Sequence, residues 1–426
     1  MFALVDVNSM YASCEKIFDP IARRTGVIVL SNNDGCVVAM CRLAKAKLGN
    51  VKFQPYFKIS KQVEASGVTV RSSNYELYSD LSASIMDILS RYSPQQHIYS
   101  IDESFLRFQT QPKESWWHLG KEIRRVIWQE VRLPVCVGMG PTATLAKAAN
   151  HYAKKNRNTG GVSVIDKQNI MTVLQTMAVE DIWGIGGRLG KKLRLMAIDN
   201  AWKLSQQPTK LMRQQFSVNI ERTVTELQGE SCITWDEVRS PKQQIFSTRS
   251  FGEKVTDYVS LEQSLVMHSE KVARKARKQG SLIKMMVAFA HSSPFSDGQI
   301  YRRNIHHGFF DATADSRDLA IAASEAAKQI YRPGVLFHKS GVGAVELVDN
   351  VMYQRDMFSV QGRDPRVMAA LDTINQRYGP DSISLAAKGI QEKWQMRRAM
   401  KSPNYTSSWL DMVRINCSNT ITKENG

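Results

Sequence analysis

Two short apolar runs, far apart in the chain, are each interrupted by acidic residues. Residues 2–8 read Phe-Ala-Leu-Val-Asp-Val-Asn and contain Asp6, and residues 97–106 contain the adjacent pair Asp102 and Glu103. Short apolar runs closed by polar residues are typical of buried strands. The pattern therefore predicts two strands that carry carboxylates. Adjacent strand residues point to opposite faces, so a tight turn or bulge is needed if both acids of the pair are to reach one site.

The remaining pattern predicts helices between further strands. Apolar residues recur at helical spacing over 10–18, 79–92, 116–131 and 142–155, and short apolar runs at 27–30 and 135–139 predict strands. Strand-like pieces return at 281–290 and 334–348. Strands separated by helices, with acids on two of the strands, predict a mixed α/β sheet.

The acids could form a metal site if their strands are neighbours in one sheet. A buried carboxylate is costly unless a cation compensates it. Asp6, Asp102 and Glu103 would then converge on a pair of divalent cations, and Mg²⁺ is usually held by one or two carboxylates together with substrate phosphates. Two such ions suit in-line phosphoryl transfer. A turn or a salt bridge is the ordinary role of such acids, and these residues alone leave that alternative open.

The overall composition predicts a polyanionic binding partner. The chain has 426 residues, which suggests two to four domains, and its 57 Lys and Arg against 40 Asp and Glu give a formal charge of +17. No apolar run is long enough to span a bilayer, and the N-terminus does not have the pattern of a signal peptide. The six cysteines form no paired motif, which predicts free thiols and a cytoplasmic location.

Three later motifs fit contact with nucleic acid or with a partner protein. Gly184-Ile185-Gly186 opens a basic helix and is typical of helix-hairpin-helix contact with a phosphate backbone; a dinucleotide fingerprint lacks its strand and its acid here. Residues 271–278 hold five basic side chains in eight positions. Residues 354–358 end in two large apolar side chains, which suits docking into a hydrophobic pocket.

Together these residues resemble a known family. The motifs that carry the resemblance are LVDVNSMYASCE at 4–15, SNNDGC at 31–36, SSNYELY at 72–78, YSIDE at 99–103, Leu145-Ala146-Lys147 with Asn150 and Lys154, WGIG at 183–186 and RSFG at 249–252. In this order they are similar to the Y-family translesion DNA polymerases, and among these to the UmuC type. The likeness extends over nearly the whole chain, including the short C-terminal tail.

The resemblance implies a multi-domain α/β fold shaped as a right-handed polymerase. Its parts would be a mixed α/β palm, small fingers, a helical thumb with the helix-hairpin-helix, an α+β little finger and a short tail. The implied boundaries are palm 1–30 and 77–166, fingers 31–76, thumb 167–235, little finger 243–348, and clamp-binding linker with tail 349–426. The implied activity is template-directed DNA synthesis past lesions in the SOS damage response, with two Mg²⁺ ions and without proofreading.

The resemblance also implies roles for individual residues. Asp6, Asp102 and Glu103 would be catalytic and, with the Val7 carbonyl, would bind metal; Tyr11 would be the steric gate that rejects a ribose 2′-OH. Further implied sets are triphosphate ligands Arg42, Lys45 and Lys154; base-pair contacts Gly35, Cys36 and Val37; DNA-backbone contacts Gly184, Gly186, Lys191, Lys192, Arg249, Arg274, Lys275, Arg277 and Lys278; and clamp-binding anchors Gln354, Met357 and Phe358.

The implied partners are primer–template DNA and a dNTP, the sliding clamp, a processed UmuD-like dimer and a RecA-type recombinase filament, with no membrane. Ser104 and Arg107 depart from the family pattern beside the acid pair, and an extra residue near Ala46 makes Lys45 a less secure ligand. Two other functions share parts of the pattern. A two-metal nuclease uses the same acids, and a catalytically silent, clamp-tethered scaffold would keep only DNA binding.

Overall fold

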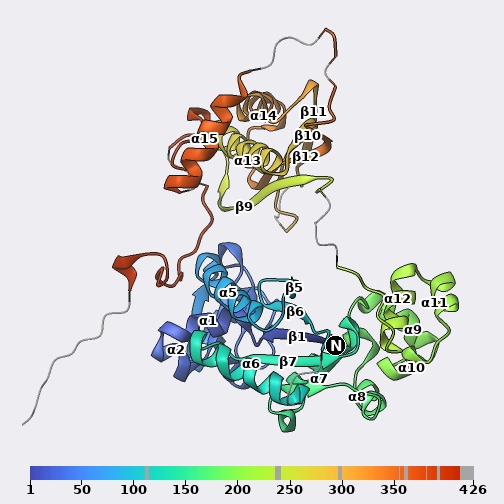
Figure 1. Cartoon of the computed structure of the whole chain (residues 1–426). Helices are drawn as coiled ribbons and strands as arrows, with labels where there is room; N and C mark the ends of the chain where they lie inside the picture. The colour runs from blue at the N-terminus through green and yellow to red at the C-terminus, as the bar shows by residue number, and fades with distance from the viewer. Residues whose placement is uncertain are drawn as a thin grey trace, which may run out of the picture. The chain divides into compact units, whose positions relative to one another are not determined.

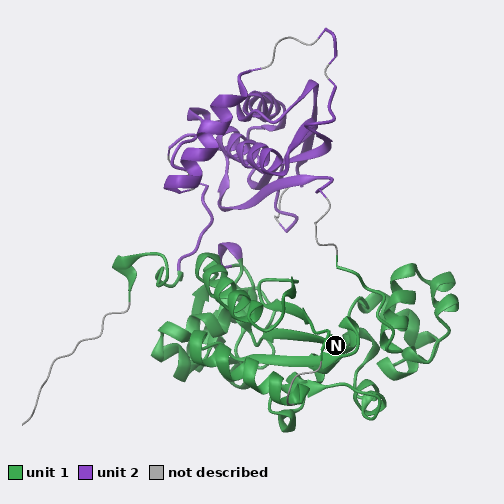
Figure 2. Cartoon of the chain, in the orientation of Figure 1, with its two compact units in different colours: residues 1–31, 35–236, 400–426 green, residues 32–34, 237–399 purple. Residues whose placement is uncertain are grey.

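A computed structural model of the chain describes residues 1–110, 115–235, 241–295, 300–354, 356–358, 363–379, 381–390 and 394–412. The chain divides into two compact units, each with its own hydrophobic core (Figure 2). Unit 1 comprises residues 1–31, 35–236 and 400–426, and unit 2 comprises residues 32–34 and 237–399. No helix in the described ranges has both the length and the apolar character needed to cross a bilayer.

The centre of unit 1 is a five-stranded sheet in the order β5-β6-β1-β7-β8 (Figure 1). Its strands are β1 (Phe2–Val7), β5 (Gln95–Ile98), β6 (Glu103–Arg107), β7 (Val135–Gly140) and β8 (Val162–Val164). All six residues of β1 are buried, since β1 lies between the antiparallel neighbours β6 and β7. The β7–β8 pair is parallel, so the sheet is mixed, as the sequence predicts.

The prediction of a single strand over residues 97–106 is wrong, because the chain reverses direction inside this run. β5 and β6 form a hairpin in which Ile98 pairs with Ser104. The backbone N–H groups of Tyr99 and Ser100 both donate to the Glu103 carbonyl, at 3.1 Å each. This is the tight turn that the acid pair needed, and it leaves Asp102 in the turn and Glu103 at the start of β6.

Helices α1 (Met10–Phe18), α5 (Tyr75–Ser90), α6 (Trp116–Val131) and α7 (Ala143–Lys155) belong to the same part of unit 1. α1 and α6 have the predicted bounds. α5 begins earlier than predicted because the Asn74 side chain accepts a hydrogen bond from the Leu77 N–H and caps it. α7 packs closely on β7: a Cβ at Gly138 would lie 2.0 Å from the Asn150 backbone nitrogen. This close approach sets the height of α7 above the sheet.

The rest of unit 1 consists of two smaller groups of elements. A three-stranded sheet has the order β3-β2-β4 and, with its helices, contains β2 (Val27–Leu30), β3 (Val37–Met40), β4 (Thr69–Ser72), α2 (Pro20–Thr25), α3 (Arg42–Leu48) and α4 (Tyr56–Ser66). A helical group follows, with α8 (Ile170–Gln175), α9 (Gly187–Leu195), α10 (Ala201–Ser205), α11 (Thr209–Gln215) and α12 (Val218–Leu227) around its own apolar cluster.

Unit 2 is a four-stranded antiparallel sheet, in the order β11-β10-β12-β9, packed against two helices (Figure 1). Its elements are β9 (Ile245–Val255), β10 (Ser281–Ser292), β11 (Arg302–Thr313), β12 (Phe337–Asp349), α13 (Tyr258–Gln279), α14 (Ser316–Ile330) and α15 (Pro365–Tyr378). The strand-like pieces at 281–290 and 334–348 correspond to β10 and β12, whereas the pattern did not predict β11.

The segment after residue 349 is divided between the two units. α15 and the short helix at Ala386–Lys388 belong to unit 2, and the chain from Met400 onward belongs to unit 1. The segment 349–426, predicted as linker and tail, therefore contributes residues up to 399 to unit 2 and residues from 400 to unit 1. The other predicted boundaries of palm, fingers, thumb and little finger stay predictions.

Candidate active site

The backbone positions of the three predicted acids lie at one end of β1. Asp6 is 5% exposed on the central strand, and its direct partner across the β1–β6 pairing is Glu103. The Val7 N–H donates to the Asp102 carbonyl at 2.9 Å, which holds the acid-bearing turn against the end of β1. The two runs are thus neighbouring strands, which is the condition that the sequence could state but not test.

Two lysines of α7 neutralise the opposed acids. Lys154 Nζ lies 2.5 Å from Asp6 Oδ1, and Lys147 Nζ lies 2.9 Å from Glu103 Oε2. The two lysines are seven positions apart, which is close to two helical turns, so they share one face of α7. Lys147 is absent from the predicted ligand set, although its spacing from Lys154 was the signal that could have identified it.

The electrostatics of the pair are unequal. Burial raises the pKa of Asp6 to about 7, although the Lys154 ammonium opposes the shift. Burial also acts to raise the pKa of Glu103, but hydrogen bonds with Asp6 and Lys147 outweigh it, and the pKa falls below its ordinary value. Near neutral pH the pair therefore carries less than two negative charges, and a further cation would favour its full ionisation.

The donor chemistry at this end of β1 suits a hard cation that arrives with its substrate. Carboxylate and carbonyl oxygens are the ligands that Mg²⁺ prefers. In the described ranges no three Asp, Glu, His or Cys side chains are grouped as a metal site, and Asp102 Oδ1 accepts a hydrogen bond from Ser100 Oγ at 2.6 Å. Because Mg²⁺ commonly takes only one or two carboxylates and completes its shell with phosphate and water, the opposed acids fit this metal.

Tyr11 lies at the start of α1 in a cluster of three tyrosines. Its ring stacks on Tyr78 with centroids 4.6 Å apart and planes at 12°, and it meets Tyr75 edge-on at 5.8 Å. Tyr78 is fully buried, whereas Tyr11 is half-buried. Burial raises the pKa of the Tyr11 phenol, so this side chain is uncharged at physiological pH.

The predicted nucleotide contacts lie on the small three-stranded part of unit 1. Arg42 and Lys45 are exposed on α3, which begins directly after β3. Val37 begins β3, and the turn before it is closed by the Cys36 N–H, which donates to Ser31 Oγ at 3.0 Å. Gly35 lies within this turn and belongs to unit 1.

The helix-hairpin-helix motif has the predicted form. Gly184 adopts φ +88°, a conformation that favours glycine, and Gly186 is the N-cap residue that directly precedes α9. Lys191 and Lys192 are exposed on α9. Exposed backbone N–H groups at a helix start, followed by free lysines, suit a phosphate backbone.

The basic cluster on α13 differs from the open stripe that the sequence predicts. Arg277 donates to Asp372 of α15 at 2.7 and 2.8 Å and to the Ala314 carbonyl at 2.7 Å. Lys275 donates to the Phe246 carbonyl at 3.2 Å. These bonds favour a structural role for both side chains over a DNA contact. Arg274 is likewise engaged, with Asp381 at 3.8 Å; Lys278 is exposed, and Arg249 is half-buried on β9.

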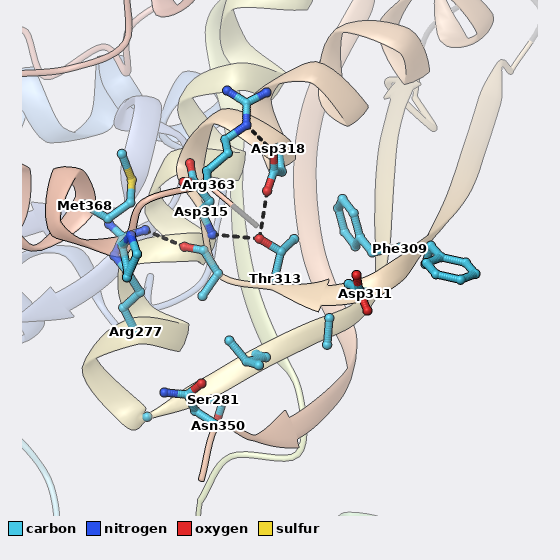
Figure 3. A pocket seen from close by; sticks show the side chains of 16 residues that line it. Arg277, Ser281, Phe309, Asp311, Thr313, Asp315, Asp318, Asn350, Arg363 and Met368 are labelled. Carbon is cyan, nitrogen blue, oxygen red and sulfur yellow. Dashed lines mark hydrogen bonds and ion pairs between the residues drawn. The ribbon is translucent and has the colours of Figure 1, made fainter. Parts of the chain in front are cut away.

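Arg277 also lines a cavity of about 510 Å³ in unit 2 (Figure 3). Two charged groups in the cavity wall are paired with each other: Arg363 Nε lies 2.9 Å from Asp318 Oδ1, and Thr313 Oγ1 donates to the other Asp318 oxygen at 2.9 Å (Figure 3). Arg277 and Asp315 are paired with Asp372 and Arg317 outside the wall. The cavity therefore offers no cluster of free titratable groups, and we assign it no chemistry.

The predicted clamp-binding anchors are accessible. Met357 is 90% exposed and Phe358 is 79% exposed, while the Phe358 N–H donates to Asp356 Oδ1 at 2.9 Å. Gln354 is exposed as well, and Arg355 lies outside the described residues. Two large apolar side chains held in the open by a local turn are available to a partner pocket.

Four family models match the chain. They are the impB/mucB/samB family over residues 5–151, the IMS family HHH motif over 167–196, the impB/mucB/samB family C-terminal domain over 242–357, and a domain of unknown function, DUF4113, over 365–415. The third model covers the strands of unit 2, and the fourth covers the segment that is divided between the units.

Similar proteins cover almost the whole chain. Protein UmuC of Salmonella typhimurium (strain LT2) is 39% identical over 97% of this chain and 100% of its own length. Protein MucB of Escherichia coli is 36% identical over 96% and 98%, and DNA polymerase IV 2 of Bacillus subtilis is 26% identical over 93% and 97%. Among solved structures, a Y-family DNA polymerase chimera is similar in fold, with TM-score 0.62 and 17% identity over 82% of this chain and all of that one.

An acid pair on a mixed central sheet, a helix-hairpin-helix group and a separate four-stranded unit define the class, which is a Y-family DNA polymerase. Within this class the chain belongs to the impB/mucB/samB family and is of the UmuC type. It is a DNA-directed DNA polymerase that performs translesion synthesis in the response to DNA damage. The fold and the enzyme class predicted from the sequence are thereby confirmed.

Proposed function

We propose that Asp6, Asp102, Glu103 and the Val7 carbonyl hold two Mg²⁺ ions when DNA and a dNTP are bound. Held by these residues, the ions would neutralise charge at the primer 3′-hydroxyl and at the pyrophosphate leaving group. The observation that carries this proposal is the direct pairing of Asp6 with Glu103, each neutralised by a lysine of α7. Acids so compensated are available to exchange a lysine for a metal.

We further propose that Lys154 and Lys45 bind the phosphates of the incoming nucleotide. Lys154 Nζ contacts Asp6 in the free protein, so an incoming triphosphate offers this ammonium a second anionic partner beside the same acid. Arg42 and Lys45 are exposed on α3 and complete the triphosphate set. Because Lys147 contacts Glu103, we add it as a residue that orients this acid.

Selection of the nucleotide falls to two groups. Tyr11 acts as the steric gate, because its ring is backed by the fully buried Tyr78 and cannot retreat from a 2′-hydroxyl. Gly35 and Cys36 lie against the nascent base pair, where glycine and one small side chain select only weakly by shape. Val37 is fully buried at the start of β3, so its side chain supports this contact from the core. Weak shape selection is what copying past a lesion requires.

Contacts to the DNA backbone come from the start of α9, with Gly184, Gly186, Lys191 and Lys192, and from Arg249 and Lys278 in unit 2. Such phosphate contacts make the affinity fall steeply with salt. Gln354, Met357 and Phe358 dock into a pocket of the sliding clamp. A processed UmuD-like dimer and a RecA-type recombinase filament complete the proposed assembly.

Primer extension with one dNTP on an undamaged template tests this assignment of residues. The wild-type chain should lengthen the primer, and Asp102→Ala should abolish extension while DNA binding is retained. Shortening of the primer would indicate a two-metal nuclease, and binding without any change would indicate a silent scaffold. Extension by the Asp102→Ala variant at the wild-type rate would refute the metal assignment.

A further inference from the structure

The C-terminal segment 400–406, which is part of unit 1, packs against the rest of this unit close to the cluster of Tyr11, Tyr75 and Tyr78. The Ser72 N–H donates to the Met400 carbonyl at 3.0 Å, and the Met400 N–H donates to Ser72 Oγ at 2.9 Å. The ring of Tyr405 stacks on Phe18 of α1 at 4.7 Å. The segment is thus held by backbone bonds at one end and by an aromatic pair at the other.

Between these two points, Ser402 enters the interior. It is 4% exposed, and its hydroxyl donates to Glu15 Oε1 at 3.1 Å across 387 positions of sequence. Asn74 Nδ2 donates to the same hydroxyl at 2.9 Å, while Asn74 Oδ1 caps α5. Ser402 therefore links Glu15 on α1 to the first turn of α5.

Glu15 in turn binds Tyr78, the residue on which the ring of Tyr11 stacks. The Tyr78 hydroxyl donates to Glu15 Oε1 at 2.7 Å, and Tyr11 stacks on the Tyr78 ring. Glu15 is 1% exposed, and burial raises its pKa, while the hydrogen bonds from Tyr78 and Ser402 oppose that shift. Glu15 Oε2 accepts no hydrogen bond within the described structure, although Arg71 Nε lies 3.9 Å from it. The hydrogen bonds that orient this carboxylate are therefore the two donated to Oε1.

We propose that Ser402 is a positioning residue for nucleotide sugar selection, acting through Glu15 and Tyr78 on Tyr11. The inference rests on the proposed role of Tyr11 as the steric gate. Removing the Ser402 hydroxyl leaves Tyr78 as the only hydroxyl donor to Oε1, so the carboxylate and the phenol bonded to it gain freedom. The ring of Tyr11 then has a less rigid support, and a 2′-hydroxyl can push it aside.

The test compares ribonucleotide and deoxynucleotide insertion opposite the same template base by the full chain. Ser402→Ala should raise the ratio of kcat/KM for the ribonucleotide to kcat/KM for the deoxynucleotide by about three- to tenfold, which is the range expected for one buried hydrogen bond. The kcat/KM for the deoxynucleotide should change less than twofold. Tyr78→Phe, which removes the other donor and keeps the ring, should shift the ratio in the same direction.

Ser407→Ala is the matched control, because Ser407 directly follows this segment, is exposed, and its hydroxyl makes no hydrogen bond in the described structure. It should leave the ratio unchanged. In a Tyr11→Ala background, which should itself admit ribonucleotides, Ser402→Ala should add nothing, because its effect passes through Tyr11. If Tyr11→Ala admits ribonucleotides but Ser402→Ala only lowers Tm at an unchanged ratio, the positioning role is wrong. If Tyr11→Ala does not change sugar selectivity, the gate assignment itself is wrong and the inference falls with it.

Discussion

Replacing Asp6 by Asn should stabilise the metal-free protein at pH 8 while abolishing polymerase activity. Asp6 is buried and its pKa is raised to about 7, so ionising it in the folded state is costly. The folded state retains the Asp6 proton at pH values where the unfolded chain has already lost it. The free energy of unfolding of the wild type should therefore fall, relative to that of the variant, as the pH rises from about 4 to about 7, and the difference should be constant above that.

The size of the expected stability difference follows from the pKa of Asp6 in the folded protein and its ordinary value. A pKa of about 7 against an ordinary value of 3.8 corresponds to about 4 kcal/mol at pH 8. Asn is itself polar and leaves the Lys154 ammonium without its partner, so we expect a net gain of about 1–3 kcal/mol. Lys154 is partly exposed, and water can solvate the ammonium once Asp6 is gone.

Urea unfolding at pH 5 and pH 8 in EDTA measures this difference. Glu103→Gln is the comparison variant, because the contact of Glu103 with Lys147 at 2.9 Å favours its ionised form and the sign of the effect reverses. The stability that Glu103 contributes is present above its ordinary pKa and is lost as the pH falls, so this variant should be destabilised at pH 8. A wild-type protein more stable than Asp6→Asn at pH 8 would refute the reasoning that the cost of burying Asp6 exceeds the stabilisation from its contact with Lys154.

Three further predictions address the site and its partners. Asp102→Ala should lower single-nucleotide extension by at least about a hundredfold with DNA affinity unchanged in a gel-shift assay, because a metal ligand acts mainly in the transition state; equal loss of binding would contradict this. Tyr11→Ala should incorporate ribonucleotides at a rate close to that for deoxynucleotides, as measured by gel extension with matched triphosphates. Replacing Met357 and Phe358 together by Ala should weaken capture by the sliding clamp at least about tenfold and leave activity on clamp-free primers unchanged, since both side chains are exposed. Unchanged clamp affinity would count against the anchors.

Local patterns were sufficient for much of unit 1. The acids inside apolar runs predicted strands with chemistry, and helical spacing predicted α1 and α6 to the residue. The motif order predicted the enzyme class. Each of these features is written in neighbouring residues, and short-range periodicity and turn chemistry are the information that a sequence shows most directly.

Other features depend on contacts between distant residues. Apolar spacing predicts one strand over residues 97–106 and misses the hairpin turn, because turn residues with apolar neighbours do not interrupt periodicity. The charge pattern predicts an open basic stripe on α13 and does not show that Asp372 of α15 binds Arg277. Pairing partners of this kind are set by packing alone.

The acids, tyrosines and glycines of this polymerase, and their order, can be identified from the sequence alone. The pairing of Asp6 with Glu103, the placement of one α7 lysine at each acid and the contact of Ser402 with Glu15 become visible only in the folded chain. The physical reason is that a buried charge must find its compensation in three dimensions. Which residue supplies it depends on strand register and helix height, which no local pattern records.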